Sequence, residues 1–263
     1  MVHVTSFYKF LPLDREGLAS VQQDLLQQMA EFSLLGTVIL SVEGINATVA
    51  GTEQAILAFK TKLIKRFGEL RFKDSTCETE PFRRAEVVIR KEIVTMKREL
   101  IPEGTEATHL SPTEWHEMLL NDEPKVLIDT RNDYEMLAGK FRGAIDPGLK
   151  RFSDWETYLD STPLDKDVPV MIYCTGGIRC EKAIVPLLER GFEKVYQLRD
   201  GILGYLAEYP DGEYEGECYV FDGRVALDQH LQPSQTYAHC AICGATALRS
   251  PQGDSLCDSC ATR

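Results

Sequence analysis

The stretch VPVMIYCTGGIRCEKA, residues 168–183, decides how the middle of this chain folds. Its apolar run ends at Cys174, two glycines follow, and an amphipathic segment begins near Arg179. This is the order of a strand, a tight turn and a helix. Glycines let the turn point successive backbone N–H groups to one place at the positive end of the helix, where an anion is favoured. Because such surroundings lower the pKa of a thiol, we predict that Cys174 is a catalytic thiolate and that Arg179 stabilises negative charge beside it.

The rest of the loop contributes backbone N–H groups and a second thiol. Two roles are open for Cys180, which either resolves an oxidised Cys174 as a disulfide or packs at the start of the helix. The predicted active-site loop is completed by Thr175, Gly176, Gly177, Ile178 and Cys180.

The spacing within the loop separates two classes of cysteine enzyme. Four residues stand between Cys174 and Arg179, whereas cysteine phosphatases have one residue more and a wider cradle that fits phosphate. The shorter loop resembles that of rhodaneses, which form a cysteine persulfide. The upstream stretch LIDTRNDYEMLAGKFRGAIDPG, residues 127–148, also resembles a rhodanese signature. Asp129 and Arg131 within it are expected to support the loop, either as a structural ion pair or in a direct catalytic role.

Strands and helices alternate on both sides of this loop. Apolar runs at 125–130 and 168–174 are each followed by a turn, and 195–206 has the pattern of a strand, a turn and a helix. Alternation of this kind predicts a parallel sheet with its functional groups at the carboxyl ends of the strands. We therefore expect a rhodanese-like α/β domain over residues 113–212, preceded by a polar linker at 99–112.

Residues 1–98 have the pattern of a smaller, separate domain. Apolar residues spaced by three and four predict helices over 13–32 and 53–68. Strands are predicted at 6–10, as a hairpin over 36–51, at 70–73 and at 85–96. The order β-α-β-β-α-β is that of a ferredoxin-like α+β domain.

The C-terminal segment, 213–263, is a cysteine-rich extension that is too short to bury an apolar core of its own. It ends in two Cys-x-x-Cys pairs that are 13 residues apart, a spacing close to that of a zinc ribbon. Four thiolates around Zn²⁺ would hold such a segment together, and disulfides or free thiols are the alternative. The predicted zinc ligands are Cys240, Cys243, Cys257 and Cys260.

Charge is distributed unevenly along the chain. The net charge is −12, yet residues 60–98 contain 12 basic and 6 acidic side chains. Such a stretch either binds a polyanion or forms a solvated face. The sequence has no apolar run of about 18 residues and no N-terminal signal pattern, so we expect a cytoplasmic protein without a membrane partner. It also contains no flavin, haem or nucleotide signature and no indication of an obligate protein partner.

Five blocks, in this order along the chain, resemble one family. They are EGINATVAG (43–51), RKEIVT (90–95), IDTRNDYE (128–135), YCTGGIRCEKA (173–183) and YVFDGRVA (219–226). Together they resemble the bacterial tRNA uridine hydroxylase family. The resemblance implies oxygen-dependent conversion of a wobble uridine to 5-hydroxyuridine, with the tRNA anticodon loop as partner, molecular oxygen as co-substrate and Cys174 as the required cysteine. One departure from the family pattern is Asp200, which stands where a glycine is usual before the last helix.

With this resemblance, the basic stretch becomes a candidate surface for RNA, since lysine and arginine contacts to phosphates position a nucleic acid. The predicted RNA-binding residues are Lys62, Lys65, Arg66, Arg83, Arg84, Arg90 and Lys91.

Two chemical routes for Cys174 stay open at this point. The thiolate either adds to carbon 6 of the uracil and makes carbon 5 nucleophilic, or carries the oxygen as a sulfenate or peroxide adduct. A thiosulfate or persulfide sulfurtransferase is the alternative function, and a catalytically inactive binding module is the third.

Overall fold

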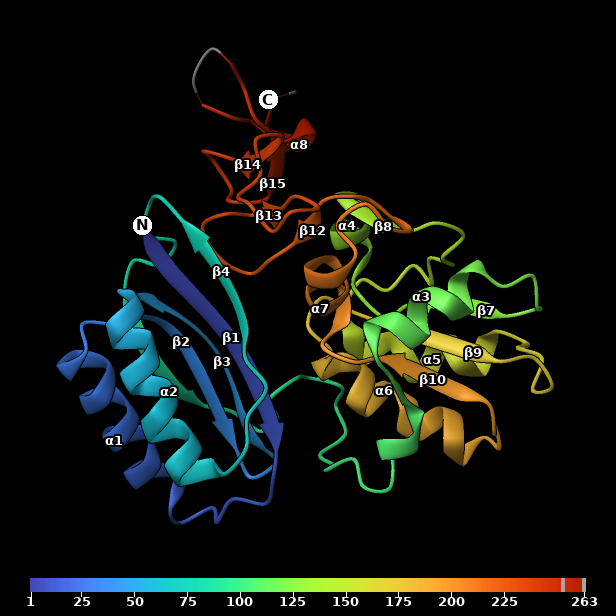
Figure 1. The fold of residues 1–263 in the computed structure, drawn as a ribbon, viewed down its shortest axis with the longest axis horizontal. Coiled ribbons are helices and arrows are strands. Elements are labelled where there is room, and N and C mark those ends of the chain that lie inside the picture. Colours follow the sequence, from blue (N-terminus) through green and yellow to red (C-terminus); the bar gives the residue numbers. More distant parts are fainter. Residues whose placement is uncertain (252–253, 262–263) are drawn as a thin grey trace.

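The N-terminal part of the chain is built on a five-stranded sheet. The computed structural model describes residues 1–251 and 254–261. The order of the strands is β4-β1-β3-β2-β5, and two helices cover one face of the sheet (Figure 1). The elements are β1 (Val2–Phe10), α1 (Leu18–Glu31), β2 (Leu35–Ser41), β3 (Gly44–Gly51), α2 (Glu53–Phe67), β4 (Lys73–Cys77) and β5 (Ala85–Ile89). The ferredoxin-like order is confirmed, with β5 added in parallel beside β2.

Two strands differ from the prediction. β4 begins at Lys73, where the predicted strand 70–73 ends, and β5 stops at Ile89, well before residue 96. Beyond β5 the backbone is hydrogen-bonded to a side chain instead of a strand: the N–H of Ile93 donates to Glu43 Oε2 at 3.1 Å. A carboxylate thus takes the place of a neighbouring strand.

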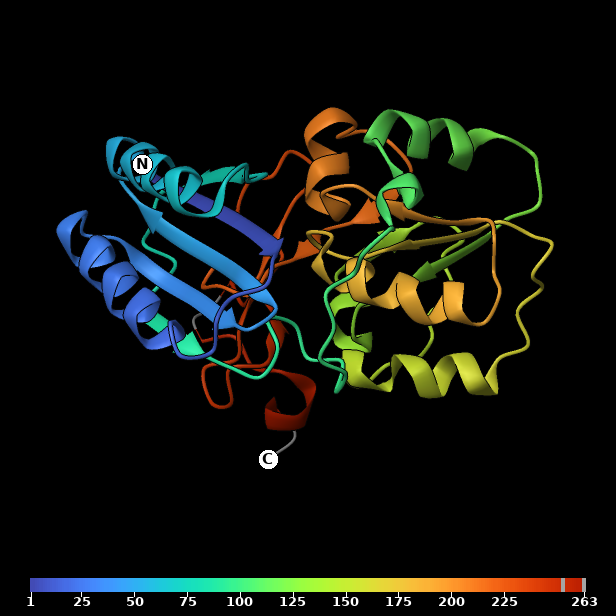
Figure 2. The same ribbon diagram turned by 90° about the horizontal axis from the view of Figure 1, so that it is seen from below.

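The two faces of this sheet have different chemistry, as expected where one face is packed and the other is open. The packed face meets the helices through an apolar core that includes Leu25, Met29, Val38, Phe59 and Leu63. The other face is turned towards the rest of the molecule (Figure 2). It presents the mostly polar side chains Ser6, Thr37, Asn46 and Thr48.

A four-stranded parallel sheet, in the order β6-β10-β9-β7, forms the central domain. Helices α3 and α7 cover one face, and α5 and α6 cover the other (Figure 2). The elements are η1 (Glu106–Thr108), β6 (His109–Leu110), α3 (Pro112–Leu120), β7 (Val126–Asp129), α4 (Asp133–Met136), β8 (Gly139–Phe141), η2 (Phe152–Asp154), α5 (Trp155–Ser161), β9 (Val170–Tyr173), α6 (Ile178–Glu189), β10 (Val195–Leu198) and α7 (Gly201–Glu208). The predicted parallel sheet is confirmed, and its edge strand β6 lies within the stretch predicted as a linker.

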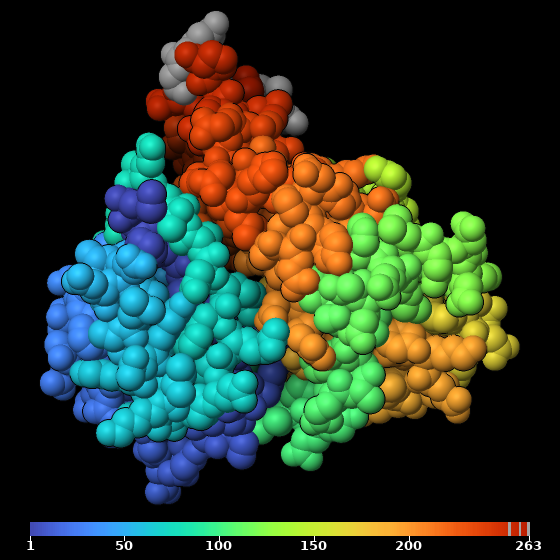
Figure 3. Space-filling view, viewed as in Figure 1, coloured from blue at the N-terminus to red at the C-terminus, as the bar shows by residue number. Residues whose placement is uncertain are grey.

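The C-terminal segment packs over the junction of the two domains. Figure 3 shows its dark orange to red atoms against the cyan part of the N-terminal domain and next to the central domain, which is coloured green to orange. Its elements are β11 (Tyr214–Gly216), β12 (Cys218–Tyr219), β13 (Ala226–Leu227), β14 (Tyr237–His239), β15 (Thr246–Leu248) and α8 (Asp258–Ala261). Among the described residues, no helix has the length and apolar character needed to cross a membrane.

A buried lysine on α6 ties the two domains together. Lys182 is fully buried, and its Nζ donates to Glu43 at 2.6 Å, to Glu92 at 2.7 Å and to the carbonyl of Arg98 at 3.0 Å. All three N–H donors of the ammonium group are therefore used. Because α6 begins within the loop after Cys174, these bonds fix that loop relative to the N-terminal sheet.

Candidate active site around Cys174

Cys174 directly follows β9, at the carboxyl end of the parallel sheet, and its side chain is buried. The N–H of Gly177 donates to its Sγ at 3.1 Å. Gly177 has φ +98°, a conformation that glycine adopts without steric cost. The Cys174 loop, residues 174–180, thus curls around the sulfur as the glycine pattern predicts.

The surroundings of the sulfur favour the thiolate. Burial alone would raise the pKa of Cys174, but the hydrogen bond from Cys180, the charge of Arg179 and the loop N–H groups lower it to about 5. The pKa of Cys180 moves in the opposite direction, since burial and the adjacent Cys174 sulfur both raise it. At neutral pH Cys174 is therefore a thiolate, and Cys180 is a thiol that donates to it.

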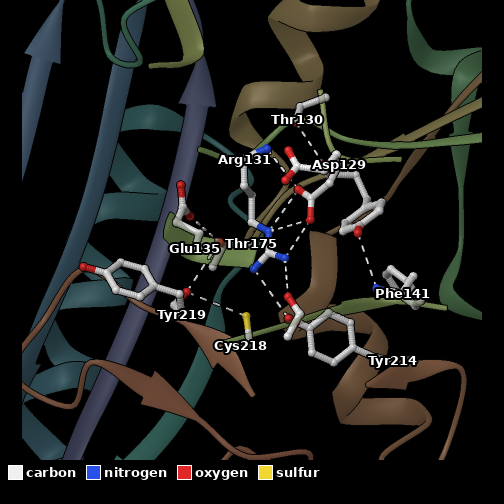
Figure 4. Close-up of polar contacts among 12 residues, drawn as sticks. Asp129, Thr130, Arg131, Glu135, Phe141, Thr175, Tyr214, Cys218 and Tyr219 are labelled. Atoms are coloured by element: carbon white, nitrogen blue, oxygen red, sulfur yellow. Dashed lines mark hydrogen bonds and ion pairs between the residues drawn. The ribbon is translucent and has the colours of Figure 1, made fainter. Parts of the chain in front are cut away.

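Arg179 is held by a buried carboxylate that the sequence motifs did not single out. Its guanidinium donates to Glu135 at 2.5 and 2.8 Å, and Glu135 is fully buried. Thr175 lies within 3.4 Å of the Glu135 carboxylate, and the two are seen together in Figure 4. With its Nη groups committed to Glu135, Arg179 acts on Cys174 chiefly as a fixed positive charge.

A local signal for Glu135 is present in the sequence. The N–H of Asn132 donates to Glu135 Oε1 at 3.0 Å, which is the spacing of a capping box at the start of α4. That spacing marks Glu135 as a structured carboxylate. Its pairing with Arg179, 44 positions away along the chain, has no local signal.

Asp129 and Arg131 form a buried ion pair at the end of β7. Arg131 donates to the Asp129 carboxylate at 2.7 to 3.0 Å and to the carbonyl of Gly139 at 2.7 Å. Its Nη1 also lies 3.4 Å from the hydroxyl of Tyr214 (Figure 4). These bonds tie β7 to β8 and β11, and none of those found among the described residues reaches the Cys174 sulfur. The geometry favours the structural ion pair over the direct catalytic role.

A cleft of about 910 Å³ lies above the Cys174 loop and between the two domains. The N-terminal sheet contributes its polar face, including Ser6, Tyr8, Asn46, Thr48 and Lys73. The central domain contributes Arg151, Cys174, Arg179 and Asp200, and the C-terminal segment contributes Phe221 and Arg224. All three parts of the chain therefore share one cavity with Cys174.

Two residues of the N-terminal domain reach the Cys174 loop itself. The Tyr8 hydroxyl donates to Glu181 at 2.9 Å, and a Cβ at position 177 would lie only 2.7 Å from that hydroxyl oxygen. A side chain at 177 would therefore clash with the Tyr8 hydroxyl and would be strained by the positive φ. The stem of Lys73 lies against Gly176, whose Cβ would be 3.5 Å from Lys73 Cε.

Asp200, the departure from the family pattern, has a role in the domain junction. It adopts φ +61°, so its backbone takes the left-handed conformation in which glycine is usual. Its Oδ2 accepts from Arg71 at 2.6 Å, and its Oδ1 lies 3.6 Å from Lys73 Nζ. The aspartate therefore supplies a contact between domains that glycine would lack.

The seven predicted RNA-binding residues do not gather at the cleft. None of them lines it, and α2, which carries three of them, lies on the far face of the N-terminal sheet (Figure 1). Lys62 and Arg66 form ion pairs with Glu31 and Asp24 on α1, at 3.0 and 2.8 Å. Arg84 pairs with its neighbour on β5, Glu86. Lys65, Arg83, Arg90 and Lys91 are exposed.

The four C-terminal cysteines converge on one point. Their sulfur atoms all lie within 4.8 Å of one another, and Cys243 and Cys257 are 3.6 Å apart. The first pair follows β14, and the second leads into α8. A set of four thiols at this separation fits a metal ion with tetrahedral sulfur ligands.

The chain is similar to known families over two regions. The UPF0176 acylphosphatase-like domain matches residues 2–93, and the rhodanese-like domain matches residues 111–208. A rhodanese-like domain from Anabaena sp. and one from Staphylococcus aureus, both solved structures, are each 22% identical, with TM-scores of 0.35 and 0.32. They cover 41% and 37% of this chain, and 79% and 90% of their own chains are matched.

Three relatives match nearly the whole chain, and each is named tRNA uridine(34) hydroxylase. The protein of Bdellovibrio bacteriovorus is 40% identical over 98% of this chain and 76% of its own length. That of Legionella pneumophila (strain Lens) is 44% identical over 87% and 91%. That of Picosynechococcus sp. is 41% identical over 92% and 82%.

Proposed function

The chain belongs to the tRNA uridine(34) hydroxylase family, and from this membership we propose that its reaction takes place at Cys174. It is a tRNA-modifying hydroxylase. The substrate that we propose is the wobble uridine in the anticodon loop, and the product is 5-hydroxyuridine. The site of action that we propose is the cytoplasm.

One observation carries this proposal: a thiolate lies at the floor of a cleft that can take a nucleotide. Sites for small molecules measure roughly 300–1,000 Å³, and the cleft of about 910 Å³ is at the upper end of that range. Bases of an anticodon loop are unpaired, so a uridine can turn out into a pocket without breaking a base pair.

The thiolate offers a direct route to hydroxylation. Addition of Cys174 Sγ to carbon 6 of the uracil forms an S–C6 bond and shifts an electron pair through carbon 5 to O4. Carbon 5 then bonds one oxygen atom derived from molecular oxygen, while a two-electron donor reduces the second atom to water. Loss of the proton on carbon 5 and cleavage of the S–C6 bond restore the double bond and the thiolate.

The second route uses the same sulfur as an oxygen carrier. Molecular oxygen oxidises the Cys174 thiolate to a sulfenate, while a two-electron donor reduces the second oxygen atom to water. The sulfenate then passes its oxygen to carbon 5, which loses its proton as the thiolate is restored, or Cys180 attacks the sulfenate sulfur and forms a disulfide with release of water. The hydrogen bond between the two sulfur groups supports the resolving role, since the thiol lies within reach. Both routes require Cys174.

RNA docking is proposed on the rim of the cleft in addition to the seven basic residues predicted above. Lys97 and Arg151 line the cleft and are exposed, as suits contacts to phosphates. Phe221, which is 61% exposed and lies over Arg179 at 5.8 Å, offers a ring on which a base can stack.

Zinc is proposed for the C-terminal cysteines. Cys240, Cys243, Cys257 and Cys260 would hold the ion, which would supply the cross-link that this coreless segment needs. The expected content is one zinc per chain by elemental analysis, and a metal-free, fully active and stable protein would contradict the assignment.

The proposed activity is tested on tRNA from cells that lack this protein. We expect 5-hydroxyuridine and its derivatives to disappear from the nucleosides, as measured by mass spectrometry, and to return with the wild-type chain but not with Cys174→Ser. Unchanged tRNA together with lost thiosulfate sulfurtransferase activity would favour the alternative function.

The route is tested with an anticodon stem-loop that carries 5-fluorouridine at position 34. Because fluorine blocks the loss of the carbon 5 proton, addition at carbon 6 should leave a covalent complex between Cys174 and the RNA. Cys180→Ser, which keeps the reactive sulfur, is the matched control. Failure to trap a complex with an active enzyme would leave the sulfenate route.

A further inference from the structure

Two buried lysines of this protein have opposite surroundings. Lys182 is fully buried and gives each of its N–H donors to an oxygen within 3.0 Å. The Lys73 side chain is only 8% exposed, yet its Nζ has no hydrogen-bond partner within the described part of the chain. Burial of an ammonium group costs solvation free energy unless new hydrogen bonds replace those to water. At Lys73 no such bonds with the described residues compensate that cost, so its N–H donors are available to a ligand.

The groups around Lys73 lie close to its Nζ but form no hydrogen bond with it. Asp200 Oδ1 lies 3.6 Å from Nζ, which is too far for a normal hydrogen bond, and Arg71 binds the other oxygen of this carboxylate at 2.6 Å. The Tyr8 ring lies under Nζ at 4.8 Å from its centre. Burial lowers the pKa of Lys73, while the charges of Asp200 and Cys174 oppose that shift.

Lys73 lies in the cleft beside the Cys174 loop. It is the first residue of β4, it packs against Gly176 of the Cys174 loop, and it lines the cleft. The other buried cations of the described cleft are committed, Arg179 to Glu135 and Arg224 to Asp222. Lys73 is therefore the buried cation that can form new bonds with a molecule entering the cleft.

We propose that Lys73 Nζ binds an anionic oxygen of the RNA substrate beside Cys174. This oxygen is either a backbone phosphate oxygen or O4 of the uracil, which gains negative charge when the thiolate adds to carbon 6. The inference rests on the proposed function, and it makes the active site a composite: the central domain supplies the nucleophile and the N-terminal domain supplies the cation.

The test compares Lys73→Met with the wild-type enzyme, with full-length tRNA as substrate. Methionine keeps the length and apolar stem but removes the charge and donors. Loss of a donor to O4 should lower kcat by about 10²–10³-fold with little change in KM. Loss of a phosphate contact should instead raise KM by about tenfold or more, with kcat kept. Either pattern supports direct contact with the substrate, and unchanged kcat and KM would overturn it.

Stability separates this role from a structural one. Since methionine removes a buried cation that lacks hydrogen bonds, the melting temperature of Lys73→Met should equal or exceed that of the wild type. A marked fall would assign Lys73 to the fold and overturn the proposal. Lys9→Met is the matched control, because Lys9 also lies in the N-terminal domain, donates to the carbonyls of Phe67 and Glu69 at 2.8 and 2.9 Å and does not line the cleft; its kcat and KM should stay at wild-type values.

Two further measurements exclude an indirect effect. Lys73→Arg, which keeps charge and donors, should recover part of the activity. The pH profile of Cys174 alkylation by iodoacetamide should move only slightly upward in Lys73→Met, since the loss of one nearby positive charge disfavours the thiolate; a shift large enough to account for the lost activity would show that Lys73 acts only through the thiol. Failure of the proposed function itself is distinct, because Cys174→Ser would then keep forming 5-hydroxyuridine.

Discussion

Two buried cysteines in this protein, Cys174 and Cys240, occupy similar backbone settings and lead to different chemistry. Each is followed within four residues by a glycine with positive φ, Gly177 at +98° and Gly244 at +74°. Around Cys174 the neighbours are backbone N–H groups, one thiol and a guanidinium. Around Cys240 the neighbours are three further sulfur atoms within 4.8 Å. The number of sulfur neighbours, more than the turn, therefore distinguishes the nucleophile proposed at Cys174 from the metal ligand proposed at Cys240.

The largest expected effect comes from removing the proposed nucleophile. Cys174→Ser should lower hydroxylation by at least about 10³-fold, measured as 5-hydroxyuridine formed on tRNA in vitro, while zinc content stays unchanged. The physical reason is that a serine hydroxyl in the same place is not ionised at neutral pH. Substantial activity in this variant would show that Cys174 is not the reacting group.

The next effect concerns the charge that maintains the thiolate. Glu135→Gln removes the carboxylate that pairs with the buried guanidinium of Arg179, so the free energy of unfolding should fall by about 3–5 kcal/mol, measured by denaturant titration. Glu215→Gln is the control, because it breaks an exposed pair with Arg142 and should cost less than about 1 kcal/mol. Equal effects of the two substitutions would contradict the role given to Glu135.

Cys257→Ser tests the metal site proposed at the four C-terminal cysteines. With three sulfur ligands left, zinc affinity should fall by at least about 100-fold, measured by competition with a chromogenic chelator. Alkylation of Cys174 should proceed as in the wild type, since the two sites share no ligand. A change in both sites would mean that the C-terminal segment supports the Cys174 loop directly.

The smallest expected effect is a pH profile. Because the pKa of Cys174 is lowered to about 5, its alkylation rate should be constant from neutral pH down to about 6. The rate should then fall about tenfold per pH unit once the thiolate is protonated. The measurement is the decrease of the unmodified Cys174 peptide, followed by mass spectrometry after timed treatment with iodoacetamide. A midpoint near 8.5, that of an ordinary thiol, would contradict the geometry of the loop.

Local features of the site could be predicted from the sequence because they rest on neighbouring residues. The strand that ends at Cys174, the turn at Gly177 and the helix beyond it lie within one short stretch. The spacing of the two Cys-x-x-Cys pairs likewise predicts that Cys240, Cys243, Cys257 and Cys260, the proposed zinc ligands, lie close together, and their sulfur atoms do so. In each case the feature depends on residues that are close together in the sequence.

Contacts between distant segments could not be predicted in the same way. Lys73 lies beside Gly176, and Tyr8 lies beside Gly177, but no pattern in the sequence links these positions across two domains. The basic residues of α2 show that a run of charge in the sequence does not reveal which partners its side chains meet in the fold. Lys62 is part of a basic run in the sequence, yet in the fold it pairs with Glu31 on the neighbouring helix, and this pairing has no local signal in the sequence.

The buried ammonium of Lys182 constrains how this chain can evolve. Its acceptors, Glu43, Glu92 and the carbonyl of Arg98, all precede the central domain. Recombination could move the central domain alone into another protein. The buried ammonium of Lys182, on the helix that follows Cys174, would then have lost all three acceptors. The two domains should therefore be inherited as a unit, and a free-standing descendant of the central domain should carry an apolar residue at position 182.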